Sequence, residues 1–152
     1  MESALQYKLV EVALAATLEV PTNRMGAFRA RLRHLKNLGL PADKPGSGKQ
    51  IAYSRRQVLE LLIALEIENL GVAPKRAAML APSIVRQAPY GSFNGHDQYV
   101  AISPSDREPR YTVALGFQPF LQFLKSSPRA FSVINVSACA RSLDQAIAHA
   151  HR

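Results

Sequence analysis

Residues 37–54, NLGLPADKPGSGKQIAYS, lie between two segments of helical periodicity and are rich in glycine and proline. The Gly48-Lys49 pair invites comparison with a phosphate-binding loop, G-x-x-x-x-G-K followed by Ser or Thr. The first glycine of that pattern would fall on Asp43, and the hydroxyl residue on Gln50, which cannot ligate magnesium. We therefore reject a nucleotide-binding loop. The segment instead predicts a β-hairpin with a basic tip that closes on residues 50–53.

Two helices are expected before this hairpin. Residues 3–19 place apolar side chains at helical spacing, with Ser3 as the N-cap. Pro21 ends that helix because proline keeps the preceding residue out of the helical region. A second helix, from about residue 23 to residue 38, stops at Gly39 and carries one apolar stripe, formed by Met25, Phe28, Leu32 and Leu35.

Two further helices are expected after the hairpin. Ser54 opens the first of them, and Gln57, three residues on, completes a capping box. This helix is apolar nearly all round and ends at Gly71, which predicts that it is the central helix of the core. Pro74 stands at the start of a fourth, short helix.

The formal net charge is +8, and it is unevenly distributed. Residues 24–56 contain nine basic residues against the single acidic residue Asp43, so this segment holds the whole excess and the rest of the chain is neutral. A concentrated cationic patch is typical of a protein that binds a polyanion, because each neutralised phosphate releases condensed counterions. The alternative is a solvated charged face without a partner.

The helix at residues 23–38 favours the nucleic-acid interpretation. Opposite its apolar stripe lie small or amide residues, which let a helix axis approach a surface closely. Basic residues flank them on both sides, where arginine can reach phosphates or guanine edges and asparagine can reach adenine edges. The small or amide set is Asn23, Gly26, Ala27, Ala30 and Asn37, and the basic flanks are Arg29, Arg33 and Lys36 on one side and Arg24 and Arg31 on the other.

The order of these elements resembles the winged helix-turn-helix domain of the bacterial MerR-like regulators over about residues 5–81. The residues that carry the resemblance are N-L-G-L-P at 37–41, I-A-Y-S at 51–54 and E-N-L-G-V-A-P at 68–74. It implies that residues 44–49 form the tip of the wing and that Lys49 meets a DNA phosphate. It also implies that Tyr53 lies on the second wing strand, and that Arg55 and Arg56 contact the DNA backbone.

Two departures from that family shape our expectations. Its dimers pair through a long helix after the DNA-binding domain, whereas Pro82 and Pro89 interrupt the corresponding region here, so dimerisation must differ. Its metal-sensing members use paired cysteines, and this chain has only Cys139, which we expect to be a small core residue in a reducing compartment.

The C-terminal third predicts a small α/β module that resembles no family we know. Residues 83–96 read as a linker, and residues 97–152 contain three short strand-like runs, a helix near residues 119–124 and a last helix near residues 138–149 with Ser137 as its N-cap. The aromatic set in this part is expected to be core (Phe117, Phe120, Phe123 and Phe131).

The sequence thus predicts an α+β chain: a winged helix-turn-helix at residues 1–82, mainly α with a β-hairpin wing, a linker, and an α/β module at residues 97–152. The expected function is a sequence-specific DNA-binding transcriptional regulator, with the module mediating homodimerisation or contact with a partner such as RNA polymerase. Double-stranded DNA is the expected partner, through Asn23, Arg24, Ala27, Arg29, Arg31, Arg33, Lys36, Lys44, Lys49, Tyr53, Arg55 and Arg56.

Other functions remain as alternatives. An excisionase-like or architectural DNA-bending protein would use the same winged fold, and a small-molecule sensor would line a ligand pocket with the strands between residues 99 and 136. No convincing catalytic set, metal-ligand spacing or cofactor motif is present, so we do not expect an enzyme, a metal or a cofactor. Without an 18-residue apolar run, we expect no membrane association and a cytoplasmic, nucleoid-associated protein.

Overall fold

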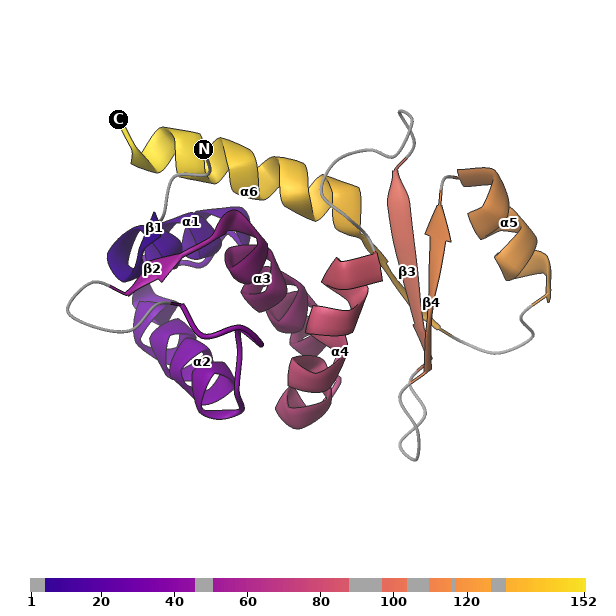
Figure 1. Cartoon of the computed structure of the whole chain (residues 1–152), viewed down its shortest axis with the longest axis horizontal. Helices are drawn as coiled ribbons and strands as arrows, with labels where there is room; N and C mark the ends of the chain where they lie inside the picture. The colour runs from indigo at the N-terminus through magenta and orange to yellow at the C-terminus, as the bar shows by residue number, and fades with distance from the viewer. Residues whose placement is uncertain (1–4, 46–50, 88–96, 104–109, 116, 127–130) are drawn as a thin grey trace.

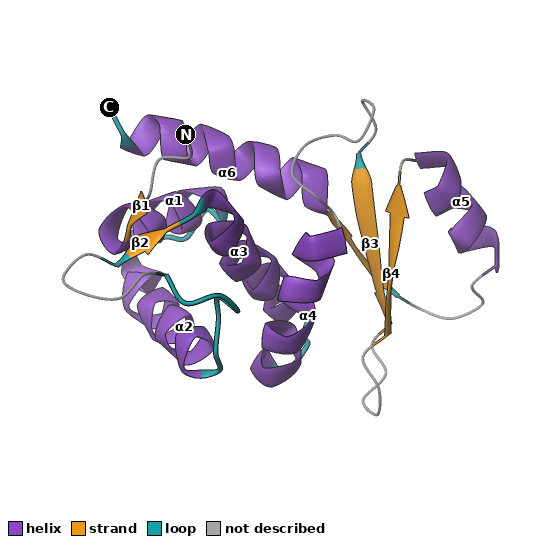
Figure 2. Cartoon of the chain, viewed as in Figure 1, coloured by secondary structure: helices purple, strands orange, loops and turns teal. Residues whose placement is uncertain are grey.

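The computed structural model describes residues 5–45, 51–87, 97–103, 110–115, 117–126 and 131–152. It combines two groups of elements, shown in Figures 1 and 2. The helical group contains β1 (Leu5–Gln6), α1 (Tyr7–Thr17), η1 (Thr22–Arg24), α2 (Met25–Asn37), β2 (Ala52–Tyr53), α3 (Arg55–Asn69) and α4 (Pro74–Gln87). The second group contains β3 (Gln98–Ser103), β4 (Arg110–Leu115), α5 (Phe117–Ser126), β5 (Ser132–Asn135) and α6 (Val136–Ala150). The expected α+β class is confirmed at this level.

Helix α3 lies at the centre of the core. Ser54 caps it as expected: the Ser54 hydroxyl accepts from the Gln57 backbone N–H, and the Gln57 side chain accepts from the Ser54 N–H. Every residue from Val58 to Leu65 is buried, and Gly71 follows the helix with φ of 85°, a left-handed conformation that glycine adopts at little cost. A helix buried on all sides needs neighbours on all sides.

Helix α6 supplies one of those neighbours. It leaves the sheet, runs back across the helical group and packs on α1 and α3 (Figure 1). Leu143 and Ala140 of α6 share one continuous apolar cluster with Val10 and Leu14 of α1. Strands β3 and β5 join the same cluster through Val100, Ile102 and Ile134. One core therefore runs through both groups of elements.

The expected wing differs from the observed pairing. Strand β2 pairs antiparallel with β1, placing Leu5 opposite Tyr53, and residues 41–45 contain no strand. A β-hairpin between residues 41–45 and 50–53 is therefore wrong for the described part of the segment. The expected wing tip, including Lys49, lies outside the described residues. The prolines at 41 and 45 cannot donate a backbone hydrogen bond, which explains why β2 pairs with β1 and not with residues 41–45.

Several helix boundaries also differ from those expected. Helix α1 begins at Tyr7 after Gln6, and Ser3 lies outside the described residues. Helix α4 continues through Pro82 to Gln87, so residues 83–87 are helical where a linker was expected. Buried Ala81, Ile84 and Val85 surround that proline, and their packing compensates for the backbone hydrogen bond that it removes.

The second group is a three-stranded antiparallel sheet in the order β4-β3-β5. Helix α5 packs on it, with Phe120 stacked on Tyr99 at a centroid distance of 5.0 Å and Phe123 edge-on to Phe131 at 5.4 Å. The three strands and this helix were expected. Of the predicted core phenylalanines, Phe120 is buried, Phe123 and Phe131 are partly buried, and the side chain of Phe117 lies outside the described part of the structure. No helix in the described part of the chain combines the length and apolar character needed to cross a membrane.

A polar cluster fixes the junction between the sheet and α6. The N-cap of α6 is Asn135, whose side-chain oxygen accepts from the Ala138 N–H, so the expected cap at Ser137 is wrong. Ser137 is buried within the helix and accepts from the Gln98 N–H at 2.9 Å. The Asn135 amide donates to Asp97, which also receives two hydrogen bonds from Arg141.

The pKa of Asp97 predicts how acid acts on this junction. The hydrogen bonds from Arg141 and then Asn135 lower the pKa of Asp97 from 3.8 to about 2. The folded state therefore binds this proton less readily than the unfolded state, and the stabilisation by Asp97 is complete above pH 3.8 and is lost as the pH falls towards 2. Urea unfolding of the wild type and Asp97→Asn should differ most at neutral pH and converge over this range. A difference that does not change with pH would contradict the assignment.

Candidate nucleic-acid interface

Helix α2 turns one face to the core and the opposite face to solvent. Its buried residues are Phe28, Leu32 and Leu35, which confirms the expected apolar stripe. The small and amide residues on the other side are all exposed: Asn23, Gly26, Ala27, Ala30 and Asn37. A Cβ atom added at Gly26 would meet no described atom within 4 Å. The outer face of α2 is therefore open to a partner surface.

Basic side chains border this open face. Arg24, in η1, and Arg33 are exposed, and the described residues place no carboxylate within ion-pair distance of either. Arg29 is also exposed, although its Nε donates to Glu11 of α1 at 2.7 Å. Exposed ion pairs of this kind are weak and leave the guanidinium able to exchange partners.

Arg31 differs from the other arginines of α2. Its guanidinium donates to three acceptors at the end of α3: the Glu68 carboxylate at 2.9 Å, the Asn69 side chain at 3.0 Å and the Leu65 carbonyl at 3.3 Å. These bonds attach α2 to α3. Arg31 was expected to contact DNA, but its observed hydrogen bonds make it a residue that orients α2.

Tyr53 also differs from the expectation. Its side chain is fully buried, and its ring lies 6.2 Å from that of Tyr7. In this conformation it cannot touch DNA, because the β1–β2 pairing turns it inward. Lys36 and Lys44 remain accessible beside it, and the Lys36 ammonium lies 4.4 Å from the centroid of the Tyr7 ring, within the range of a cation–π contact.

The basic pair at the start of α3 is partly neutralised. Arg55 donates two hydrogen bonds to Asp144 of α6, so this ion pair joins two helices far apart in the sequence. Arg56 lies 3.7 Å from Glu60, one turn along α3, and is 45% exposed. Of the two, Arg56 has the more exposed side chain.

Glu60 is a residue of this region that the sequence interpretation missed. It is 1% exposed, and one carboxylate oxygen accepts from the Ala42 N–H at 2.9 Å. Gln57 donates to the Asp43 carbonyl at 2.8 Å and fixes the next residue of the same loop. An acidic residue inside an otherwise apolar helix, four residues after Arg56, was the signal that could have revealed this contact.

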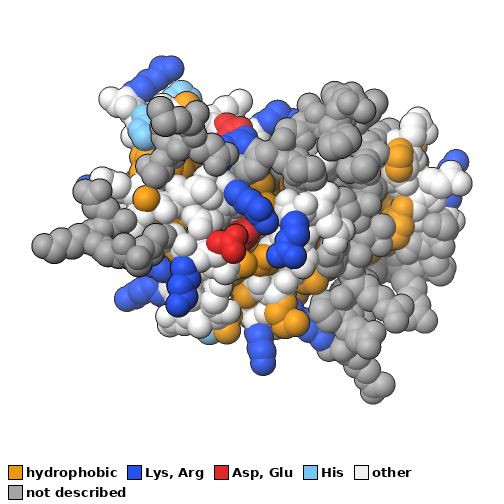
Figure 3. Space-filling model, viewed as in Figure 1, with side chains coloured by type: hydrophobic (Ala, Val, Ile, Leu, Met, Phe, Trp, Pro, Cys, Tyr) orange, Lys and Arg blue, Asp and Glu red, His pale blue; other side chains and the backbone are white. Residues whose placement is uncertain are grey.

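The face of the molecule in Figure 3 shows Lys and Arg side chains over the helical group, with acidic side chains beside some of them.

Among the described residues, no group of three or more His, Cys, Asp or Glu could hold a metal ion. Burial, with a smaller contribution from Glu66, raises the pKa of the Cys139 thiol to about 12, so it stays protonated and unreactive at neutral pH.

A comparison with models of known protein families finds no match to this chain, and a comparison with curated proteins finds none either. The function must be argued from the residues.

Glu60→Ala tests how the loop at residues 41–43 is held. The substitution leaves the Ala42 N–H without its acceptor, which should cost about 1–3 kcal/mol of stability and speed hydrogen exchange at Ala42. Glu60→Gln keeps an acceptor oxygen and should lose less stability than Glu60→Ala. Urea unfolding and amide exchange measured by NMR provide the test. Unchanged exchange at Ala42 in Glu60→Ala would show that this contact does not hold the loop.

Proposed function

We propose that this chain is a sequence-specific DNA-binding transcriptional regulator in which η1 and α2 lie against the major groove. The observation that carries the proposal is the open outer face of α2, with Gly26, Ala27 and Ala30 along its centre and exposed basic residues beside it. Small residues allow a close approach to the bases, and the flanking cations suit the two phosphate backbones. Asn23 and Arg24 are the proposed base-reading residues.

The surrounding elements support a helix-turn-helix of the MerR-like kind, in which β1 takes the place of the first wing strand as the partner of β2. The order α1, η1–α2, β2, α3 and α4 follows the order that the resemblance implies, and the turns at Gly39 and Gly71 lie where it places them. In this proposal Arg29, Arg33, Lys36, Lys44, Lys49 and Arg56 contact the DNA backbone. Arg31 and Arg55 hold α2 and α3 in position through their hydrogen bonds to Glu68 and Asp144.

We also propose a homodimer, because two copies of a helix-turn-helix gain affinity by binding half-sites about one helical turn apart. The inner face of α6 packs on α1 and α3 within the chain, so we place the dimer contact at an edge of the sheet. Strand β5 is an edge strand with β3 as its one neighbour among the described strands, and Val133 on it is 38% exposed. Unpaired edge strands readily pair with a second copy.

The DNA proposal predicts a strong dependence on salt. With roughly six phosphate contacts per copy, log affinity for duplex DNA should fall with log salt by about 0.9 for each contact. Arg33→Gln should reduce that slope by about one and weaken all duplexes alike, whereas Asn23→Ala should also relax discrimination between sequences by about 1–3 kcal/mol. Fluorescence anisotropy with a selected site and a random duplex measures both effects.

Lys125→Gln, on α5 and far from α2, is the matched control for loss of one charge, and it should leave binding unchanged. A flat salt dependence would refute DNA binding. If every variant loses the same affinity for the selected and the random duplex, an architectural protein that binds DNA independently of sequence would be favoured.

The dimer proposal predicts that Val133→Lys separates the two copies. A lysine on an edge strand resists pairing with another strand, so light scattering should show a monomer and affinity for a palindromic site should fall towards that for a half-site. Val12→Lys replaces another exposed valine, on α1, and should remain dimeric. A monomeric wild type would refute the homodimer, and a dimeric Val133→Lys would exclude β5 as its interface.

A further inference from the structure

The arginines that form hydrogen bonds within the protein use different parts of the guanidinium group. Arg55 and Arg141 each donate two hydrogen bonds to one carboxylate, and at least one terminal nitrogen takes part in each pair. Arg31 donates through Nε and through the terminal nitrogen Nη2. Arg29 donates through Nε alone, to one carboxylate oxygen of Glu11 at 2.7 Å. Neither terminal nitrogen of Arg29 has a partner among the described residues.

The Glu11–Arg29 pair lies at the border of the proposed DNA interface. The side chain of Glu11, on α1, is 13% exposed, whereas that of Arg29 is 55% exposed. On α2, Gly26 lies three residues before Arg29 and Arg33 lies four residues after it, so the three residues share one side of the helix. Gly26 belongs to the open outer face, and Arg33 belongs to its basic border. The exposed guanidinium of Arg29 is therefore available to a ligand that covers this face.

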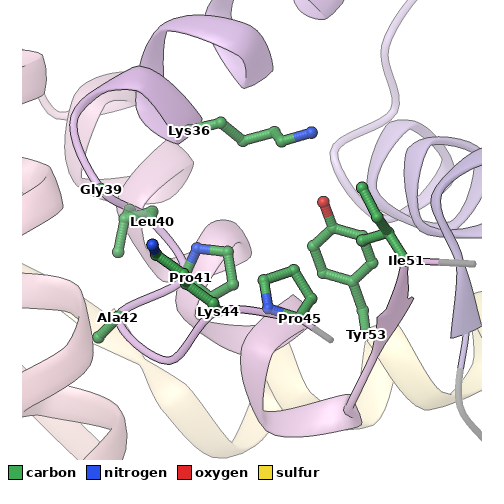
Figure 4. Close-up of a pocket in the computed structure, with 9 residues that line it drawn as sticks. All are labelled: Lys36, Gly39, Leu40, Pro41, Ala42, Lys44, Pro45, Ile51 and Tyr53. Carbon is green, nitrogen blue, oxygen red and sulfur yellow. The ribbon is translucent and has the colours of Figure 1, made fainter. Parts of the chain in front are cut away.

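The two lysines of this region are not oriented by a carboxylate. Both line a cavity of about 340 Å³ between the end of α2, the following loop and β2. The Lys36 ammonium lies over the Tyr7 ring, and Figure 4 shows the Lys44 ammonium beside Pro41 and away from Lys36. Of the described cations on α2 and this loop, Arg29 is thus the one that combines a carboxylate partner with terminal nitrogens that have none.

A DNA phosphate can meet Arg29 in two ways. In the first, the phosphate displaces Glu11, which leaves a mostly buried carboxylate without its partner, and this is costly. In the second, Glu11 keeps the Nε–H while the phosphate binds the terminal nitrogens, so no hydrogen bond within the protein is broken. The second way also starts from an oriented guanidinium, which reduces the side-chain entropy lost on binding.

We propose that Glu11 is a positioning residue for DNA binding: it holds Arg29 through Nε and leaves both terminal nitrogens to one phosphate. This inference rests on the proposed function, because the phosphate belongs to the DNA backbone. The pair itself contributes little to stability, as is usual for ion pairs with an exposed member. Its effect is on orientation, because two N–H groups directed at one phosphate bind it more strongly and more specifically than a freely moving cation. An acidic residue thereby promotes the binding of a polyanion.

The two ways predict opposite effects of removing Glu11. Displacement predicts that Glu11→Ala strengthens DNA binding, because a competing anion is lost. Positioning predicts that Glu11→Ala weakens binding of selected and random duplexes alike, by about fivefold, because Arg29 must then be ordered on binding. Glu11→Gln keeps an acceptor for the Nε–H and should lose less affinity than Glu11→Ala. Fluorescence anisotropy on the full chain measures these changes, and unchanged or increased affinity in Glu11→Ala would overturn the proposal.

Two further variants separate orientation from charge. Glu19→Ala removes an exposed carboxylate that follows α1 and has no partner among the described residues, so it should not weaken DNA binding. In an Arg29→Met background, Glu11→Ala should no longer weaken binding, because the guanidinium to be oriented is gone. Equal losses in Glu11→Ala and Glu19→Ala, or the same loss with and without Arg29, would show that Glu11 does not act through Arg29.

A measurement without DNA distinguishes failure of this inference from failure of the proposed function. NMR relaxation of the Arg29 Nε–H group in the full chain should show restricted motion in the wild type and faster motion in Glu11→Ala. If the wild type binds DNA while its Arg29 Nε–H moves freely, only the positioning role of Glu11 is refuted. If the Arg29 Nε–H is restricted but the wild type does not bind duplex DNA, the proposed function and the phosphate contact are both refuted, and the Glu11–Arg29 pair serves the fold alone.

Discussion

The burial of α3 is the constraint on which the rest of the structure depends. Because its residues from Val58 to Leu65 are all removed from solvent, α3 is stable only when helices cover it on every side. Helix α4 and the apolar stripe of α2 cover part of it, and α1 and α6 complete the enclosure. The outward direction of the basic face of α2 follows, since only the stripe opposite that face can contribute to the core.

Local signals were sufficient to predict most helices. The capping box at Ser54 and Gln57, the glycines at 39 and 71 and the stripe of α2 all act within a few residues, so periodicity and cap chemistry reveal them. Contacts between distant segments were not visible in this way. The pairing of Leu5 with Tyr53, the hydrogen bonds from Arg31 to the end of α3 and the Arg55–Asp144 pair each depend on the folded arrangement.

The same difference between local signals and contacts of distant segments applies to the residues of the candidate site. The sequence located the positive charge correctly along η1, α2 and the following loop, but it could not separate cations that hold the fold from cations that remain available. The contacts of each side chain in the fold separate the two kinds of cation. Arg31 and Arg55 donate hydrogen bonds to acceptors on other helices. No described carboxylate lies within ion-pair distance of Arg33, Lys36 or Lys44. The acidic residue Glu60 within an otherwise apolar helix was the one feature of the sequence that indicated a contact between distant segments.

The packing of α6 on α1 has a consequence for synthesis of the chain. Roughly 120 residues separate these two helices, yet they share one apolar cluster. At about 5–20 residues per second, the ribosome needs several seconds to make the intervening segment. During that time the side of α1 that α6 will cover has no partner, and the nascent chain presents apolar surface to chaperones or to other nascent chains. The synthesis of α6 therefore ends the period in which the exposed side of α1 favours aggregation over folding.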